Sequence, residues 1–180
     1  MEDSDQDFFT HLISADETSH VQAFDGIPAP VSKRTASEVY KWFQSCLLGV
    51  IICLKPSDKE AKPVPIGYVA LFKIEANHVH HRHTTLALSL LPERTGRGYG
   101  KEAILWALEW AFHHANMHRV GINAYSHNVR AVRLYERLGF VMEGREREMV
   151  WLEGRYWDLL HLGMLGREWR ELYGKELVGA

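Results

Sequence analysis

Three glycines stand at alternate positions in a short basic segment, a pattern suited to holding phosphate. Gly96, Gly98 and Gly100 fall within Pro-Glu-Arg-Thr-Gly-Arg-Gly-Tyr-Gly-Lys, residues 92–101. Glycine lets backbone N–H groups turn toward a ligand without a side chain in the way. An apolar stretch precedes the segment and an amphipathic pattern follows it, so we expect a helix N-terminus to add donors and partial positive charge. The segment therefore predicts a phosphate-binding loop.

Cationic side chains flank these glycines, namely Arg94, Arg97 and Lys101. The P-loop pattern Gly-x-x-x-x-Gly-Lys-Ser/Thr is absent. A dinucleotide fingerprint is not indicated either, because residues 119–121 carry no acidic residue where that motif needs one. The ligand is therefore expected to belong to another class of phosphate compound.

A second segment carries a proton donor on a helix. Asn128 can cap a helix that ends at Gly139, and Tyr135 lies on the inner face of that helix. A phenol with a pKa near ~10 can protonate a leaving group. Helical spacing alone favours the simpler interpretation, in which the ring only packs under its helix.

Composition limits the class of protein. The chain has 180 residues with 46% apolar and 24% charged side chains and a net charge of −2. These values predict one globular domain over residues 1–180, and they argue against a dedicated nucleic-acid binder. The longest apolar run, residues 46–54, is too short to cross a membrane. Two cysteines in apolar surroundings indicate a reducing compartment, so we expect a cytoplasmic protein.

The order of patterns predicts a mixed α/β fold. Strands alternate with helices in the second half of the chain, while turns around residues 55–65 and 153–154 require hairpins. We therefore expect one central, partly antiparallel sheet flanked by helices. The predicted strands cover residues 49–54, 66–74, 83–91, 118–125 and 156–164, and a further strand starts at residues 140–142, before the turn at 153–154.

Two motifs in the expected order resemble a known family. Gly96–Ala103 looks like the acyl-CoA pyrophosphate loop of the GCN5-related N-acetyltransferases (GNAT), and Asn128–Phe140 looks like the second signature of that family. Residues 143–145 and 154–158 resemble its ribosomal-protein (RimJ/RimL-like) branch. The resemblance implies a GNAT-like mixed sheet, here with the N-terminal strand short or missing.

The resemblance also implies a site that transfers acetyl from acetyl-CoA to a primary amine, with no metal. The CoA arm would lie between the strand ending near residue 91 and the strand 118–125. Tyr135 would be the general acid that protonates the CoA thiolate. The remaining residues expected to bind the cosubstrate are Leu88, Ser89, Leu90, Arg94, Thr95, Gly96, Arg97, Gly98, Tyr99, Gly100, Lys101, Asn128 and Ala131.

The general base and the acceptor are less defined. Glu93, His83 and Glu75 are candidate bases, and a chain of water to bulk solvent serves as well. A protein N-terminus fits the RimJ/RimL-like branch. The alternatives are a polyamine or another small amine, or a non-catalytic acyl-CoA-binding module. We expect a monomer or a homodimer without nucleic-acid or membrane partners.

Histidines gather in Asn-His-Val-His-His-Arg-His, residues 77–83. In a strand, His78 and His80 would share one face and His81 and His83 the other, so a site with all four would need a bend. No cysteine joins them. We therefore expect a solvated loop or strand edge rather than a metal site.

Overall fold

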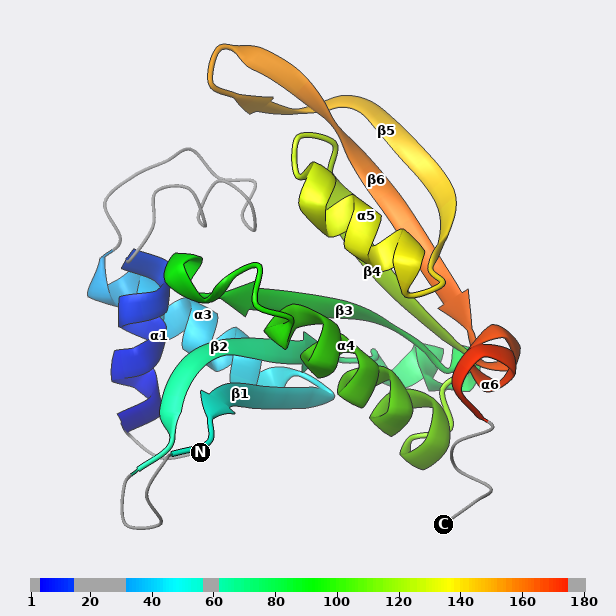
Figure 1. Cartoon of the computed structure of the whole chain (residues 1–180), viewed down its shortest axis with the longest axis horizontal. Coiled ribbons are helices and arrows are strands. Elements are labelled where there is room, and N and C mark those ends of the chain that lie inside the picture. The colour runs from blue at the N-terminus through cyan, green and yellow to red at the C-terminus, as the bar shows by residue number, and fades with distance from the viewer. Residues whose placement is uncertain (1–3, 15–31, 57–61, 175–180) are drawn as a thin grey trace.

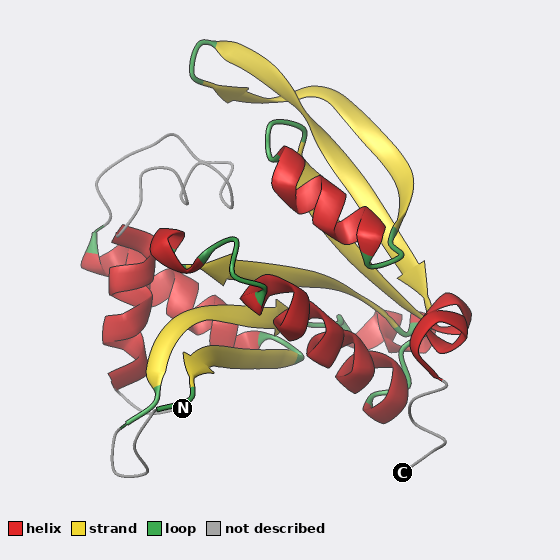
Figure 2. Ribbon diagram, in the orientation of Figure 1, coloured by secondary structure: helices red, strands yellow, loops and turns green. Residues whose placement is uncertain are grey.

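The computed structural model describes residues 4–14, 32–56 and 62–174. Its centre is a six-stranded sheet in the order β1-β2-β3-β4-β6-β5 (Figures 1 and 2). The strands are β1 (Leu48–Leu54), β2 (Val64–Leu71), β3 (His83–Leu90), β4 (Arg119–Tyr125), β5 (Val141–Leu152) and β6 (Arg155–Leu165). All neighbours are antiparallel except β3 and β4. The predicted mixed, partly antiparallel sheet is confirmed.

Helices pack on the sheet through two separate apolar clusters. The α-helices are α1 (Ser4–Ser14), α3 (Lys33–Ser45), α4 (Tyr99–Glu109), α5 (Val129–Arg137) and α6 (Gly166–Tyr173). Phe9 of α1 and Phe43 of α3 pack on Tyr68 of β2. Ile104 of α4 and Tyr135 of α5 belong to the other, larger cluster, with alternate residues of β3, β4 and β6. The two pairs of helices therefore lie on opposite faces of the sheet.

The parallel strands β3 and β4 pair over only half of their length. Their register runs from His83 opposite Arg119 to Leu86 opposite Ile122 and then stops. Beyond that point β3 stays bonded to β2 up to Leu90, and β4 stays bonded to β6 up to Tyr125. Figure 1 shows the two strands close together near α6 and spreading apart toward the glycine loop. Each strand is thus held by its outer neighbour, which keeps the divergence open.

Among the described residues no strand precedes β1, which follows α3, in line with the short or missing N-terminal strand that the resemblance implied. The histidine segment differs in detail from expectation. Residues Ala76–His81 make an exposed 3-10 helix that ends at Arg82 in the left-handed conformation, and His83 opens β3. The rings of His80 and His81 lie 3.9 Å apart. Across the ranges 4–14, 32–56 and 62–174, no group of three or more histidine, cysteine or acidic side chains is arranged to hold a metal ion.

The last two strands extend beyond the residues that the pattern marked. β5 and β6 form a hairpin of 12 and 11 residues, in which β5 starts where the pattern at residues 140–142 indicated and β6 extends beyond the predicted residues 156–164. Most of β5 is exposed and carries charged side chains, so hydrophobic alternation could not reveal its full extent. None of the described helices is both long and apolar enough to cross a membrane.

Candidate active site

The glycine loop adopts a conformation that favours glycine at two positions. Gly96 has φ of 72° and Gly98 has φ of 93°, both in the left-handed region. Gly98 is the N-cap of α4 and therefore offers no side chain to the first N–H groups of the helix. A Cβ built on Gly98 would meet no atom of the described residues within 4 Å. With respect to these residues the loop thus leaves open space in front of unpaired backbone donors, as a phosphate site requires.

Cations surround this space in different ways. Arg94 ends a short 3-10 turn, Pro92–Arg94, and its Nε is buried without a hydrogen-bond partner among the described residues. Such a group is costly to bury unless a ligand pairs with it. Arg97 and Lys101 are exposed on the loop and on the first turn of α4. The Thr95 hydroxyl donates to the Pro92 carbonyl at 2.9 Å and so fixes the start of the loop.

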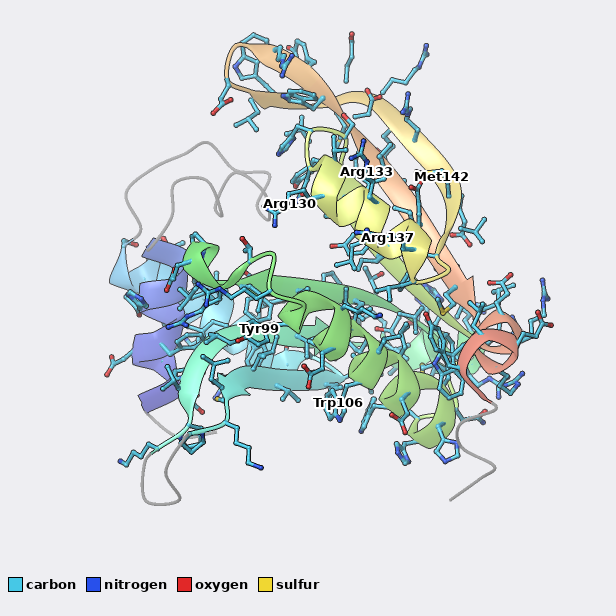
Figure 3. The ribbon with its side chains drawn as sticks, in the orientation of Figure 1. Tyr99, Trp106, Arg130, Arg133, Arg137 and Met142 are labelled. Atoms are coloured by element: carbon cyan, nitrogen blue, oxygen red, sulfur yellow. The ribbon has the colours of Figure 1, made fainter. Side chains whose placement is uncertain are left out.

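A fourth cation, Arg130, reaches the loop from another element. A Cβ on Gly96 would lie 2.6 Å from Arg130 Nη2, so the guanidinium lies against the loop backbone. Figure 3 shows Arg130 on the first turn of α5. Sequence reasoning missed this residue, although it lies inside the second signature. Its charge could be read from the sequence, whereas its direction toward Gly96 depends on how the two elements pack.

Asn128 is the helix cap that the sequence predicted. Its Oδ1 accepts a hydrogen bond from the Ala131 backbone N–H at 3.1 Å. The Ala131 N–H is therefore already used inside the protein, which argues against it as a donor to the cosubstrate. The Asn128 side-chain NH₂ is the group left to donate to the CoA arm.

Tyr135 lies deep in the apolar cluster beside the strand divergence. The residue is 8% exposed and shares the cluster with Leu86 and Ile122, the last pair before β3 and β4 separate. Burial raises the pKa of Tyr135 to about 12. Among the described residues its hydroxyl has no hydrogen-bond partner. The ring is therefore packed under its helix, and the raised pKa keeps its hydroxyl protonated and able to donate a proton.

The strand residues expected along the CoA arm occupy the unpaired half of β3. Leu88, Ser89 and Leu90 pair with β2 on one side and lie beyond the last contact with β4 on the other. Leu88 packs into the cluster under α4. Among the described residues no strand pairs with the edge of β3 that faces the divergence, so this edge can offer backbone groups as a sheet edge does to an extended ligand. Tyr99, half-buried, begins α4 next to this edge (Figure 3).

Among the described residues no hydrogen bond or ring contact joins a candidate base to Tyr135. His83 opens β3 opposite Arg119, at the closed end of the strand pair and three residues before Leu86. Glu75 lies near the same end, before Ala76, and the role of either residue as the base stays a prediction. Glu93 is exposed in the turn that leads into the glycine loop, on the phosphate side of the site.

A histidine that was not singled out lies next to Asn128. The His127 ring stacks on Tyr125 at 5.7 Å and lies 5.3 Å from the ring of Trp157. Both of its ring nitrogens are buried without a hydrogen-bond partner in the described part of the chain, and burial lowers its pKa. The face of Trp157 is covered by Arg155 at 3.7 Å. This group is enclosed by its own neighbours.

Comparison with known proteins identifies the family. Residues 1–141 match the model of the acetyltransferase (GNAT) domain. The chain therefore belongs to the GNAT acetyltransferase family, and the predicted superfamily is confirmed. The enzyme class that defines this family is the N-acetyltransferase that uses acetyl-CoA.

Individual relatives carry two kinds of name. The chain is 35% identical over 107 residues to spermidine N(1)-acetyltransferase of Vibrio cholerae, which is 59% of this chain and 60% of that protein. It is 29% identical over 89 residues to the putative ribosomal N-acetyltransferase YdaF of Bacillus subtilis, 49% of each chain. These matches thus span about half to three fifths of the relatives.

The fold agrees over a longer range. A crystal structure of the Vibrio cholerae spermidine N-acetyltransferase with CoA and spermine superposes with a TM-score of 0.76 at 25% identity, over 94% of both chains. A dodecameric structure of that enzyme gives a TM-score of 0.69 at 25% identity, over 97% of this chain and 94% of the other.

Proposed function

We propose that this protein transfers the acetyl group of acetyl-CoA to a primary amine of a polyamine. The observation that carries the proposal is the divergence of β3 and β4, with the glycine loop after one strand and Tyr135 on the helix after the other. In this proposal a phosphate cradle, a strand edge and a buried proton donor would follow one another along the divergence. This is the order of the pyrophosphate, the pantetheine arm and the thioester in acetyl-CoA.

The acceptor assignment reverses the first expectation from the sequence. The RimJ/RimL-like resemblance favoured a protein N-terminus, with a polyamine as the alternative. The relatives whose activity is named without qualification are spermidine acetyltransferases, which supports the polyamine. The putative ribosomal relative keeps a protein N-terminus as the second candidate.

Tyr135 supplies the acid step in this proposal. Attack of an amine on the thioester expels CoA as a thiolate, which must gain a proton. With a pKa of about 12, the phenol stays protonated throughout the physiological range. Gly98 and the first N–H groups of α4 would hold the pyrophosphate together with Arg94, Arg97, Lys101 and Arg130. These contacts would hold the thioester in position for attack by the amine. Holding two reactants in the right geometry lowers the reaction barrier.

A turnover screen tests the proposal. The full chain is incubated with acetyl-CoA and spermidine, spermine, simple alkylamines or short peptides with free N-termini, and released CoA thiol is measured. The expected result is the highest kcat/KM with a polyamine. A higher kcat/KM with peptides would show that the acceptor is a protein N-terminus and not a polyamine. Binding of acetyl-CoA, measured by calorimetry, without turnover of any amine would favour the non-catalytic acyl-CoA-binding module. A single domain over residues 1–180, a monomer or homodimer, and a cytoplasmic location stay predictions.

A further inference from the structure

Three arginines follow one another along one side of α5. Arg130, Arg133 and Arg137 stand at positions i, i+3 and i+7, a spacing that places side chains on the same side of a helix. All three are exposed, and none forms an ion pair within the described residues. Figure 3 shows them along α5, with Arg130 at the end nearest the glycine loop. Positive charge therefore continues from the loop along this helix.

The side of α5 that carries these arginines lies against the start of α4. A Cβ on Gly96 would lie 2.6 Å from Arg130 Nη2, and a Cβ on Gly100 would lie 3.8 Å from Leu134 Cδ2. Leu134 stands one turn after Arg130 and one turn before Arg137, so the three share a side of the helix. The arginine row thus borders the glycine loop.

Arg133 and Arg137 come together one turn beyond Arg130. Nε of Arg137 donates a hydrogen bond to the Arg133 backbone carbonyl at 3.0 Å, which draws the Arg137 guanidinium back toward Arg133. The two side chains and Glu136 line an open hollow of about 310 Å³. Three residues of helix rise only ~4.5 Å, so Arg133 stands close to the contact that Arg130 makes with the loop. Two cations against one carboxylate leave the hollow net positive.

Coenzyme A carries a third phosphate, the 3′-phosphate of its ribose, on the sugar that also bears the pyrophosphate. We infer that Arg133 and Arg137 bind this 3′-phosphate, an inference that rests on the glycine loop as the pyrophosphate site of the proposed function. A planar guanidinium can form two parallel N–H···O bonds with one phosphate group. Arg130 and the loop would hold the pyrophosphate, and the arginine pair one turn further along α5 would hold the ribose end. The chain thereby distinguishes CoA thioesters from thioesters that lack the 3′-phosphate.

Binding of two cosubstrates to the full chain tests the inference. Calorimetry gives the Kd of acetyl-CoA and the Kd of acetyl-dephospho-CoA, a compound that lacks only the 3′-phosphate. Wild type should bind acetyl-CoA about five- to tenfold more tightly, since solvent partly screens exposed arginines. Arg133→Ala and Arg137→Ala should each weaken binding of acetyl-CoA alone, and the double variant should bring the ratio of the two Kd values close to one. Glu136→Gln should increase the ratio, because it removes a negative charge beside the phosphate.

Arg130→Ala is the matched control on the same helix. It should weaken binding of both cosubstrates by the same factor, because both contain the pyrophosphate, and the ratio should keep its wild-type value. Lys101→Ala, on the first turn of α4, should behave in the same way. Thermal melts establish that each variant is folded.

A wild-type ratio of one would overturn the inference, as would a wild-type ratio that persists in the double variant of Arg133 and Arg137. Loss of the ratio in Lys101→Ala, with the ratio kept in the double variant, would place the 3′-phosphate on α4 instead. The proposed function fails by a different result, namely the absence of turnover with any amine. Both Kd values are measured without an amine, so the two failures are distinct.

Discussion

Gly96 and Arg130 meet between the glycine loop and α5, where a Cβ on the glycine would come within 2.6 Å of the guanidinium. Gly96 precedes α4 and Arg130 belongs to the first turn of α5. The contact therefore joins the two arms of the strand divergence at the predicted phosphate cradle. It brings next to the loop a cation that the loop sequence itself does not contain.

Replacing Arg130 should weaken cosubstrate binding. Charge-assisted hydrogen bonds contribute roughly 1.5–3 kcal/mol, so Arg130→Ala is expected to raise the acetyl-CoA Kd about tenfold or more. The remaining affinity should depend less on salt, because one screened charge is gone. Calorimetry at low and high ionic strength measures both effects. Arg167→Ala, at an exposed arginine of α6, is the control. Equal losses in both variants would contradict the assignment.

Gly98 allows a clean comparison with a second glycine. Gly98 and Gly154 both have positive φ, at 93° and 79°, and a Cβ on either would meet nothing within 4 Å. Alanine at each position should cost a similar ~1–2 kcal/mol of folding free energy from backbone strain. Only Gly98→Ala should weaken acetyl-CoA binding, because its methyl group enters the cradle. Calorimetry measures the acetyl-CoA affinity of both variants, and thermal melts measure their stability. Equal affinities would contradict the assignment of Gly98 to the phosphate-binding loop.

Tyr135→Phe tests the acid role. The variant keeps the buried ring and deletes the donor, so kcat should fall by about 10²–10⁴-fold with acetyl-CoA affinity nearly intact. Tyr68→Phe is the matched control, because Tyr68 is also buried with a pKa raised to about 12 but packs in the other cluster. Steady-state kinetics and melts of both variants separate catalysis from stability. A Tyr135→Phe protein that melts lower yet keeps wild-type kcat would exclude the acid role.

The same two tyrosines predict a loss of stability at alkaline pH. Burial raises both pKa values from 10 to about 12, so between these limits the unfolded chain releases protons that the folded chain keeps. The contribution of these two tyrosines to the free energy of unfolding is therefore complete below pH 10 and falls between pH 10 and 12, by up to about 1.4 kcal/mol per pH unit and group. Cys46, whose pKa is raised from 9 to about 11, acts in the same direction from pH 9 upward. Urea unfolding at pH 9, 10 and 11 should show a smaller fall in Tyr68→Phe. An identical slope would contradict the burial of that phenol.

Short sequence patterns predicted several helix ends and strands of the fold. The glycine spacing at 96, 98 and 100 predicted the turn before α4, because positive φ favours glycine. Asn128 and Gly139 marked the two ends of α5 for equally local reasons. Apolar alternation located β3 and β4, whereas it marked only the start of the exposed, charged β5, since no buried face repeats along that strand.

The amino-acid sequence by itself determined the residue types of a phosphate loop, a capped helix and a phenol, because each depends on neighbours within a few positions. Only the tertiary structure decided which of them meet. In the folded chain His83 lies at the end of β3 that pairs with β4, and Arg130 lies against Gly96. The tertiary structure also placed His161 between Asn123 and Glu146, residues 38 and 15 positions away. Strand register and helix packing set such contacts over long range, and no local pattern in the chain encodes them.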